Sequence, residues 1–240
     1  MKTRPLIIAH RGFSGRYLEN TLAAVRGALD LGIDLVEVDV HETRDGELVV
    51  FHDYRLKRIC GVRGRVRDVT LSAMKRLNPQ IPTLAEVLRL CRGKSQVLIE
   101  IKRADPRKVA AVIARMRMEN EVIVFSLSIR RMKAFAAAAP HVARFGLIAR
   151  NLRFALRALR LGAQVCSPPQ RTSPLVVNGL GLCRRLVTSR RLVDDIHRRG
   201  WKLFVWTVNR ESEMKKLARW GVDGLITNHP DRAKSCLARP

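Results

Sequence analysis

Residues Leu31 to Asp39 read LGIDLVEVD, which we interpret as the end of a helix followed directly by a strand. Its glycine follows an apolar helical pattern, as is typical where a left-handed residue ends a helix. The apolar run after it predicts a buried strand. The stretch WGVDGLIT at residues 220–227 has the same order, and Gly162 and Gly200 also stand directly before apolar runs. A helix followed closely by a strand is therefore the repeating unit of this chain.

Eight short apolar runs predict eight strands, and the segments between them have helical periodicity. The strands expected are Leu6–Ala9, Leu35–Val40, Val97–Ile101, Val122–Phe125, Arg144–Ile148, Ala163–Cys166, Leu203–Val208 and Gly224–Thr227. Eight such units in 240 residues match the size of a (β/α)8 TIM barrel, an α/β fold. No linker rich in Pro, Gly or Ser divides the chain, so we expect one domain over residues 1–240. Two segments interrupt the alternation: Tyr54–Pro82 is interpreted as a small insertion after strand two, and Arg171–Arg185 as an apolar loop after strand six.

Charged residues occur late in two of these strands. Side chains two apart on a strand share a face, so Glu37 and Asp39 point the same way, as do Glu100 and Lys102. The carboxyl ends of barrel strands form the active-site rim. Three carboxylates that converge there favour a hard divalent cation, Mg²⁺ or Ca²⁺, with Mn²⁺ as an alternative. The competing interpretation pairs each acid with one of the many arginines.

Two histidines lie near the same rim. His10 ends the first strand. A DG turn precedes residues 48–51, which are expected to form a short return strand, and His52 directly follows them. Two imidazoles beside one metal ion are suited to act as a general acid and a general base.

The charge is strongly positive, with 46 basic and 21 acidic residues and a net charge of +25. Such a surface attracts polyanions and anionic lipid headgroups. Basic residues do not alternate with aromatic ones, which disfavours nucleic acid as the partner. The five cysteines have no C-x-x-C spacing, and the N-terminus has only a short apolar run. We therefore expect reduced thiols and a cytoplasmic protein, with peripheral membrane contact as an option.

The segments that carry these residues occur together and in a recognisable order. They are AHRG, ENT, GIDLVEVDVHETRDGELVVFHD, LIEIK, FVWTVN and GVDGLITNHPD, spread from about residue 7 to residue 231. In this order and spacing the chain resembles the glycerophosphodiester phosphodiesterase family. Two positions depart from the family pattern: Leu18 stands where proline is usual, and Asn228 where aspartate is common.

The resemblance implies a barrel with an insertion after strand two and a role for each matching residue. It implies that His10 and His52 are the acid/base pair and that Arg11 and Lys102 contact the phosphoryl oxygens. Trp206 would wall the glycerol side of the pocket, with barrel core as its alternative role. The resemblance also implies that the metal ligands are the three carboxylates Glu37, Asp39 and Glu100.

The implied reaction is metal-dependent hydrolysis of a glycerophosphodiester to glycerol 3-phosphate and an alcohol. One alternative is a lysophospholipase D-type enzyme acting on lipid at an anionic membrane surface, which the charge and the apolar stretch at residues 175–182 would suit. A second alternative is a basic barrel without catalytic activity that binds polyanions. The sequence leaves open the leaving alcohol, the physiological metal, the order of the two histidines and the oligomeric state.

Overall fold

Eight parallel strands form a closed ring in the computed structural model, which describes residues 4–142, 144–149 and 177–238. The strands of the ring are β1 (Leu6–Ala9), β2 (Leu35–Glu42), β4 (Gln96–Arg103), β5 (Val122–Ser126), β6 (Arg144–Ala149), β7 (Val177–Cys183), β8 (Trp201–Trp206) and β9 (Gly224–Thr227). Each strand pairs in parallel with the next, and β1 pairs with both β9 and β2, which closes the ring. The predicted TIM barrel is confirmed.

One strand of the ring was not expected. The segment Arg171–Arg185 was interpreted as a loop, but Val177–Cys183 is strand β7, bonded to β6 on one side and β8 on the other. That interpretation is wrong because two glycines and an asparagine interrupt the apolar pattern of this strand. Gly181 lines the cavity at the barrel mouth, where a strand without a side chain leaves room for a ligand. The strand expected at Ala163–Cys166 lies outside the described residues.

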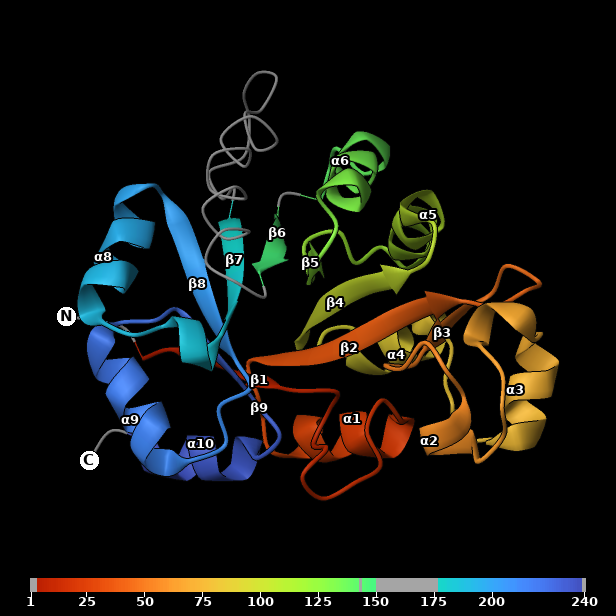
Figure 1. Cartoon of the computed structure of the whole chain (residues 1–240), viewed down its shortest axis with the longest axis horizontal. Coiled ribbons are helices and arrows are strands. Elements are labelled where there is room, and N and C mark those ends of the chain that lie inside the picture. The colour runs from red at the N-terminus through yellow and green to blue at the C-terminus, as the bar shows by residue number, and fades with distance from the viewer. Residues whose placement is uncertain (1–3, 143, 150–176, 239–240) are drawn as a thin grey trace.

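Helices cover the outside of the ring (Figure 1). They are α1 (Leu22–Asp30), α4 (Leu84–Cys91), α5 (Pro106–Met116), α6 (Ile129–Ala138), α8 (Arg190–Arg198), α9 (Glu211–Trp220) and α10 (Pro230–Cys236), with a short 3-10 turn at Arg184–Leu186. Three of the predicted helix stops are present: Gly221 caps α9 with a φ of 87°, Gly32 follows α1 with a φ of 62°, and Gly200 has a φ of 74°. Gly162 lies outside the described residues. No helix of the described part of the chain is both long and apolar enough to span a bilayer.

The predicted insertion follows a short return strand, β3 (Leu48–Val50), which runs antiparallel to β2. It contains α2 (Lys57–Cys60), a 3-10 turn (Val66–Asp68) and α3 (Leu71–Leu77), which lie to the right of the barrel in Figure 1. Its own apolar cluster fixes it to the barrel; the buried members are Val49, Phe51, Leu56, Val66, Met74 and Ile81. The insertion is therefore a packed structure and not a loose loop.

A small apolar plug fills the inside of the barrel below the rim. Its centre is Phe125 against Phe204, an edge-to-face pair with ring centroids 5.6 Å apart. Ile8, Leu35 and Leu98 pack around that pair and are at most 2% exposed. Because this plug excludes water from the lower barrel, the open space lies above it, at the carboxyl ends of the strands.

Candidate active site

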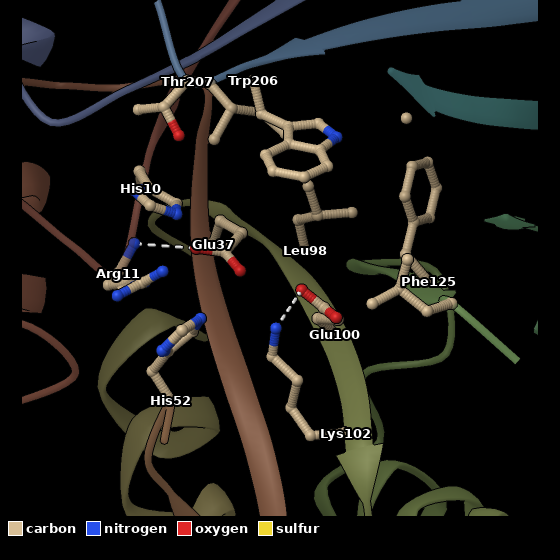
Figure 2. A pocket seen from close by; sticks show the side chains of 13 residues that line it. His10, Arg11, Glu37, His52, Leu98, Glu100, Lys102, Phe125, Trp206 and Thr207 are labelled. Atoms are coloured by element: carbon tan, nitrogen blue, oxygen red, sulfur yellow. Dashed lines mark hydrogen bonds and ion pairs between the residues drawn. The ribbon is translucent and has the colours of Figure 1, made fainter. Parts of the chain in front are cut away.

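A cavity of about 110 Å³ opens at the carboxyl ends of the strands. Figure 2 shows His10, Arg11 and His52 on one side of Glu37, with Glu100 and Lys102 facing them from β4. Seven of the eight residues predicted for the site, Trp206 among them, therefore line this cavity directly. The eighth, Asp39, is not one of the lining residues and is 1% exposed.

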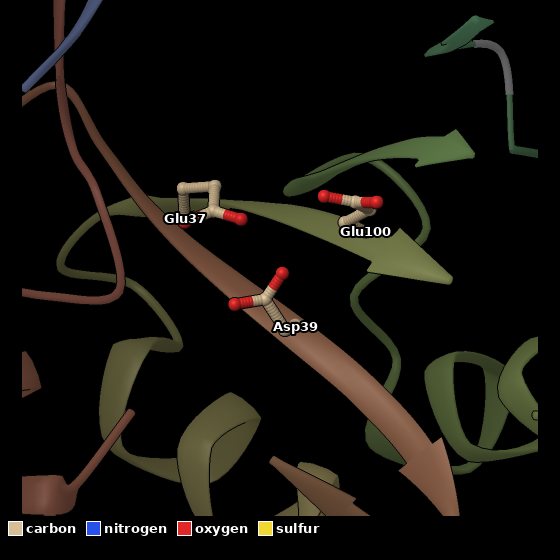
Figure 3. A group of neighbouring side chains, drawn as sticks. All are labelled: Glu37, Asp39 and Glu100. Carbon is tan, nitrogen blue, oxygen red and sulfur yellow. The ribbon is translucent and has the colours of Figure 1, made fainter. Parts of the chain in front are cut away.

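The three predicted carboxylates meet at one point (Figure 3). Asp39 and Glu100 occupy paired positions of β2 and β4, and Glu37 lies two residues before Asp39 on the same face. One oxygen from each carboxylate lies within 4.8 Å of the others. The parallel register of two neighbouring strands thus concentrates negative charge at one place on the rim.

Two cations of the chain partly neutralise this cluster. The Arg11 Nε lies 3.2 Å from Asp39 Oδ2, and the Lys102 Nζ lies 3.2 Å from Asp39 Oδ1 and 2.8 Å from Glu100 Oε2. Asn20 Nδ2 also donates to Asp39 Oδ2 at 3.0 Å. The alternative in which arginine alone pairs with each acid does not describe this site, because a lysine bridges two of the three carboxylates and a cavity remains above them.

The carboxyl groups differ in their proton affinity. Burial, followed by the charge of Asp39, raises the pKa of Glu37 well above its ordinary value, and burial also raises the pKa of Glu100. Burial acts in the same direction on Asp39, but Lys102 and Arg11 outweigh it and lower the pKa of Asp39 to about 2. The cluster therefore holds one firmly ionised carboxylate and two that retain protons more readily.

The donor set fits a hard divalent cation. Glu100 Oε1 is buried and has no hydrogen-bond partner among the described residues. An oxygen in that state has lost its water without gaining a donor, which a cation bound by the three carboxylates would correct. Glu37, Asp39 and Glu100 can thus together hold such an ion.

We expect the affinity for a divalent cation to fall as the pH falls. The raised pKa values of Glu37 and Glu100 mean that more protons must leave the site at pH 6 than at pH 8 before the ion can bind. Calorimetric titration with Mn²⁺ should show at least about tenfold weaker binding at pH 6 than at pH 8. Repeating the titration in buffers of different ionisation enthalpy should reveal proton release, and an affinity independent of pH would contradict the assignment.

His10 is held by an asparagine from the opposite end of the chain. Its Nδ1 lies 2.6 Å from Asn228 Oδ1, which also accepts a hydrogen bond from Ser14 Oγ. An amide oxygen only accepts, so Nδ1 carries the hydrogen and Nε2 is left with its lone pair. Burial, and then the charge of Arg11, lower the pKa of His10 to about 4. This imidazole is neutral at pH 7.

His52 is held by a carboxylate instead. Its Nδ1 donates to Asp53 Oδ1 at 2.7 Å, and Arg58 contacts Asp53 Oδ2 at 2.5 Å. Arg58 also binds Glu19, whose Oε1 accepts from Arg11 at 2.9 Å. Burial lowers the pKa of His52, while Asp39 and Asp53 act against that shift. The two histidines therefore differ in the hydrogen-bond partner of Nδ1, which is a neutral amide for His10 and a carboxylate for His52.

The supporting residues Asp53 and Arg58 were not singled out from the sequence. Asp53 had a signal, since it completes the segment FHD. No sequence pattern indicated Arg58, because the residue that it contacts, Glu19, is 39 residues away in the sequence.

The remaining wall of the cavity is apolar. Leu98, Phe125, Leu127 and Ile226 line it together with Trp206 at the end of β8. The indole Nε1 of Trp206 is buried and has no hydrogen-bond partner in the part of the chain that the structure describes. Trp206 lies at the cavity and also packs against the inner apolar cluster, and its contact with glycerol stays a prediction.

Comparison with known proteins gives consistent results. Residues 10–232 match the model of the glycerophosphoryl diester phosphodiesterase family. The chain is 33% identical over 249 residues to a glycerophosphodiester phosphodiesterase of Caldanaerobacter subterraneus subsp. tengcongensis, with 96% of each chain covered. It is 24% identical to a human lysophospholipase D, covering 96% of this chain and 85% of the human protein.

Solved structures agree with the fold. An Oleispira antarctica phosphodiesterase in complex with the product sn-glycerol-3-phosphate superposes with a TM-score of 0.80 at 25% identity, covering 97% of this chain and 96% of the other. A Silicibacter pomeroyi protein described as a glycerophosphoryl diester phosphodiesterase superposes with a TM-score of 0.83 at 22% identity, covering 99% and 94%. At that lower identity the second comparison supports the barrel alone.

Proposed function

This chain belongs to the glycerophosphoryl diester phosphodiesterase family, and on that premise we propose that it hydrolyses glycerophosphodiesters to glycerol 3-phosphate and an alcohol with the help of a divalent cation. The observation that carries the proposal is the cavity in which two histidines and a three-carboxylate cluster face one space. The product named in the Oleispira antarctica structure supports the same reaction. We also propose that residues 1–240 form one barrel domain.

Charge stabilisation is the first requirement of this reaction, because a phosphodiester anion repels a nucleophile. Glu37, Asp39 and Glu100 would hold the cation, which when bound supplies positive charge to the phosphoryl oxygens. Arg11 and Lys102 lie within ion-pair distance of the same cluster and line the cavity. Their guanidinium and ammonium groups would bind the phosphoryl oxygens and stabilise the charge that develops on them.

The supports of the histidines suggest which one is the base. His10 is neutral and presents Nε2, so we assign it to remove the proton from the attacking hydroxyl, which belongs to water or to the glycerol 2-position. His52 has Asp53 behind its Nδ1, and a carboxylate in that place stabilises an imidazolium. We assign His52 to protonate the departing alkoxide. Trp206 would contact the glycerol carbons and direct its free Nε1 hydrogen to a hydroxyl group.

A substrate assay with metal control tests the proposal. Purified protein should hydrolyse at least one of glycerophosphocholine, glycerophosphoethanolamine, glycerophosphoglycerol and glycerophosphoinositol, releasing glycerol 3-phosphate. EDTA should abolish turnover, and excess Mg²⁺, Ca²⁺ or Mn²⁺ should restore it, with the best of the three identifying the preferred ion. Turnover that persists after exhaustive chelation would exclude a metal role for the carboxylate cluster.

A second candidate substrate is a lysophospholipid. The observation that favours it is an exposed segment of the insertion, formed by α2 and the residues after it, in which Lys57 and Arg63 are exposed and Val62 is 36% exposed. Cationic and apolar side chains in one segment are suited to an anionic lipid surface. Activity on a lysolipid in anionic vesicles that exceeds activity on glycerophosphocholine would favour this candidate. Family membership removes the support for the alternative of a barrel without catalytic activity.

We further propose a cytoplasmic location with transient membrane contact. Cys60, Cys91, Cys183 and Cys236 are free thiols, as expected in a reducing compartment.

A further inference from the structure

Three arginines from two separate segments lie around the ring of Tyr54. The guanidinium carbons of Arg65, Arg67 and Arg103 lie 5.7, 5.8 and 4.3 Å from the centre of its ring. Arg65 also donates to the Tyr54 hydroxyl at 3.4 Å. We call Tyr54 and these three arginines the Tyr54 arginine cluster.

This cluster has too few acids to balance its charge. Asp68 is its carboxylate partner, 3.7 Å from Arg65 and 3.6 Å from Arg67. Arg103 has no carboxylate within 4.0 Å among the residues described. Like charges held together without counterions are unfavourable, and an anion with several acceptor oxygens would relieve them.

The chain places the cluster beside the catalytic residues. Tyr54 is two residues after His52, and Arg103 directly follows Lys102 at the end of β4. Tyr54 also borders an open surface hollow that it shares with Asp53 and Arg58, the residues that support His52. A group bound here would thus lie on the side of the site where His52 is assigned to protonate the leaving alcohol.

We propose that the Tyr54 arginine cluster binds a second phosphate group carried by the leaving alcohol, so that the preferred substrates are glycerophosphodiesters with a phosphorylated alcohol. This inference rests on the proposed function and narrows its substrate class. Planar guanidinium groups bind phosphate through paired hydrogen bonds, and Tyr54 holds three of them in place by contact with its ring.

The test compares two substrates that differ by one phosphate, glycerophosphoinositol and glycerophosphoinositol 4-phosphate. The wild type should have the lower KM for the phosphorylated substrate. The double variant Arg67→Gln/Arg103→Gln should raise that KM about tenfold and change the KM for glycerophosphoinositol less than twofold. Arg89→Gln/Arg115→Gln, which removes two exposed positive charges in the last turns of α4 and α5, is the charge-matched control and should leave both KM values unchanged.

Each result decides the matter. Equal KM values for the two substrates in the wild type, or an equal loss on both in the double variant, would overturn the inference while leaving phosphodiesterase activity established. A wild type that hydrolyses glycerophosphocholine but neither inositol substrate would also overturn the inference alone, whereas no turnover of any of the four glycerophosphodiesters named above would contradict the proposed function.

A membrane source of the phosphate is tested separately. Wild type and double variant are sedimented with phosphatidylcholine vesicles that contain or lack phosphatidylinositol 4-phosphate. If the double variant loses only vesicle binding and keeps its KM for the soluble pair, the cluster recognises lipid headgroups and the proposed substrate preference is wrong.

Discussion

His10→Ala and His52→Ala should each lower kcat by about 10²–10⁴-fold, the usual contribution of a positioned acid or base. The fold should survive, because both side chains lie at the cavity and outside the three apolar clusters. Turnover of the best glycerophosphodiester, measured with saturating divalent ion, checks this expectation. Circular dichroism and the thermal midpoint of each variant establish that it is folded. Full activity in either variant would remove that histidine from the mechanism.

A change of leaving group separates the two roles. p-Nitrophenolate leaves without protonation, so a glycerophospho-p-nitrophenyl ester has little need of a general acid. On this substrate His52→Ala should recover most of its lost activity, whereas His10→Ala should remain impaired because the attacking hydroxyl still needs a base. The reverse pattern would exchange the two assignments and show that the carboxylate behind His52 strengthens a base.

The carboxylates of the site were predictable from the sequence because they lie at regular positions on strands. Glu37 and Asp39 share a face through the two-residue period of β2, and the parallel register then places Glu100 beside Asp39. The alternation of helices and strands, and with it the barrel, was predictable from glycines such as Gly32 and Gly221. Both have a positive φ, and a residue in this left-handed conformation ends a helix. These features depend on local geometry, which residues close together in the sequence determine.

The parts that sequence did not predict depend on contacts between distant segments. Strand β7 is glycine-rich, and it becomes a strand because β6 and β8 pair with both of its edges. Asn228 was noted only as a departure from the family pattern, yet it is 218 residues from the histidine that it orients. Arg58 likewise acquires its role only when the insertion folds against the first loop. The spacing of apolar residues along the sequence does not indicate such contacts between distant segments.

Glu37→Gln should abolish most of the activity and at the same time make the metal-free protein more stable at alkaline pH. We expect kcat to fall at least about a hundredfold, since one of three carboxylates for the cation is lost. The amide of glutamine can still accept the hydrogen bond that Arg11 N donates to Glu37 at 2.8 Å. Local geometry is thus preserved while one buried charge is removed.

The stability effect follows from the raised pKa of Glu37, caused first by burial and then by Asp39. In the unfolded chain this carboxyl ionises near its ordinary pKa of about 4.3. In the folded protein it resists ionisation, so the free energy of unfolding decreases as the pH rises from that value through the raised pKa. The variant lacks this ionisable group, so its free energy of unfolding does not decrease in this way. The difference in free energy of unfolding between variant and wild type should be absent near pH 4 and grow toward pH 9.

Urea denaturation in EDTA at several pH values measures this advantage. Glu119→Gln, which removes one negative charge beyond the end of α5 and away from the cavity, is the matched control and should follow the wild type at every pH. Added Mn²⁺ should reverse the order, because only the wild type gains full stability from binding the ion. A metal-free Glu37→Gln protein that is less stable than the wild type at pH 9 would show that the three carboxylates are not held together against their own repulsion, and the cation site inferred from them would be lost.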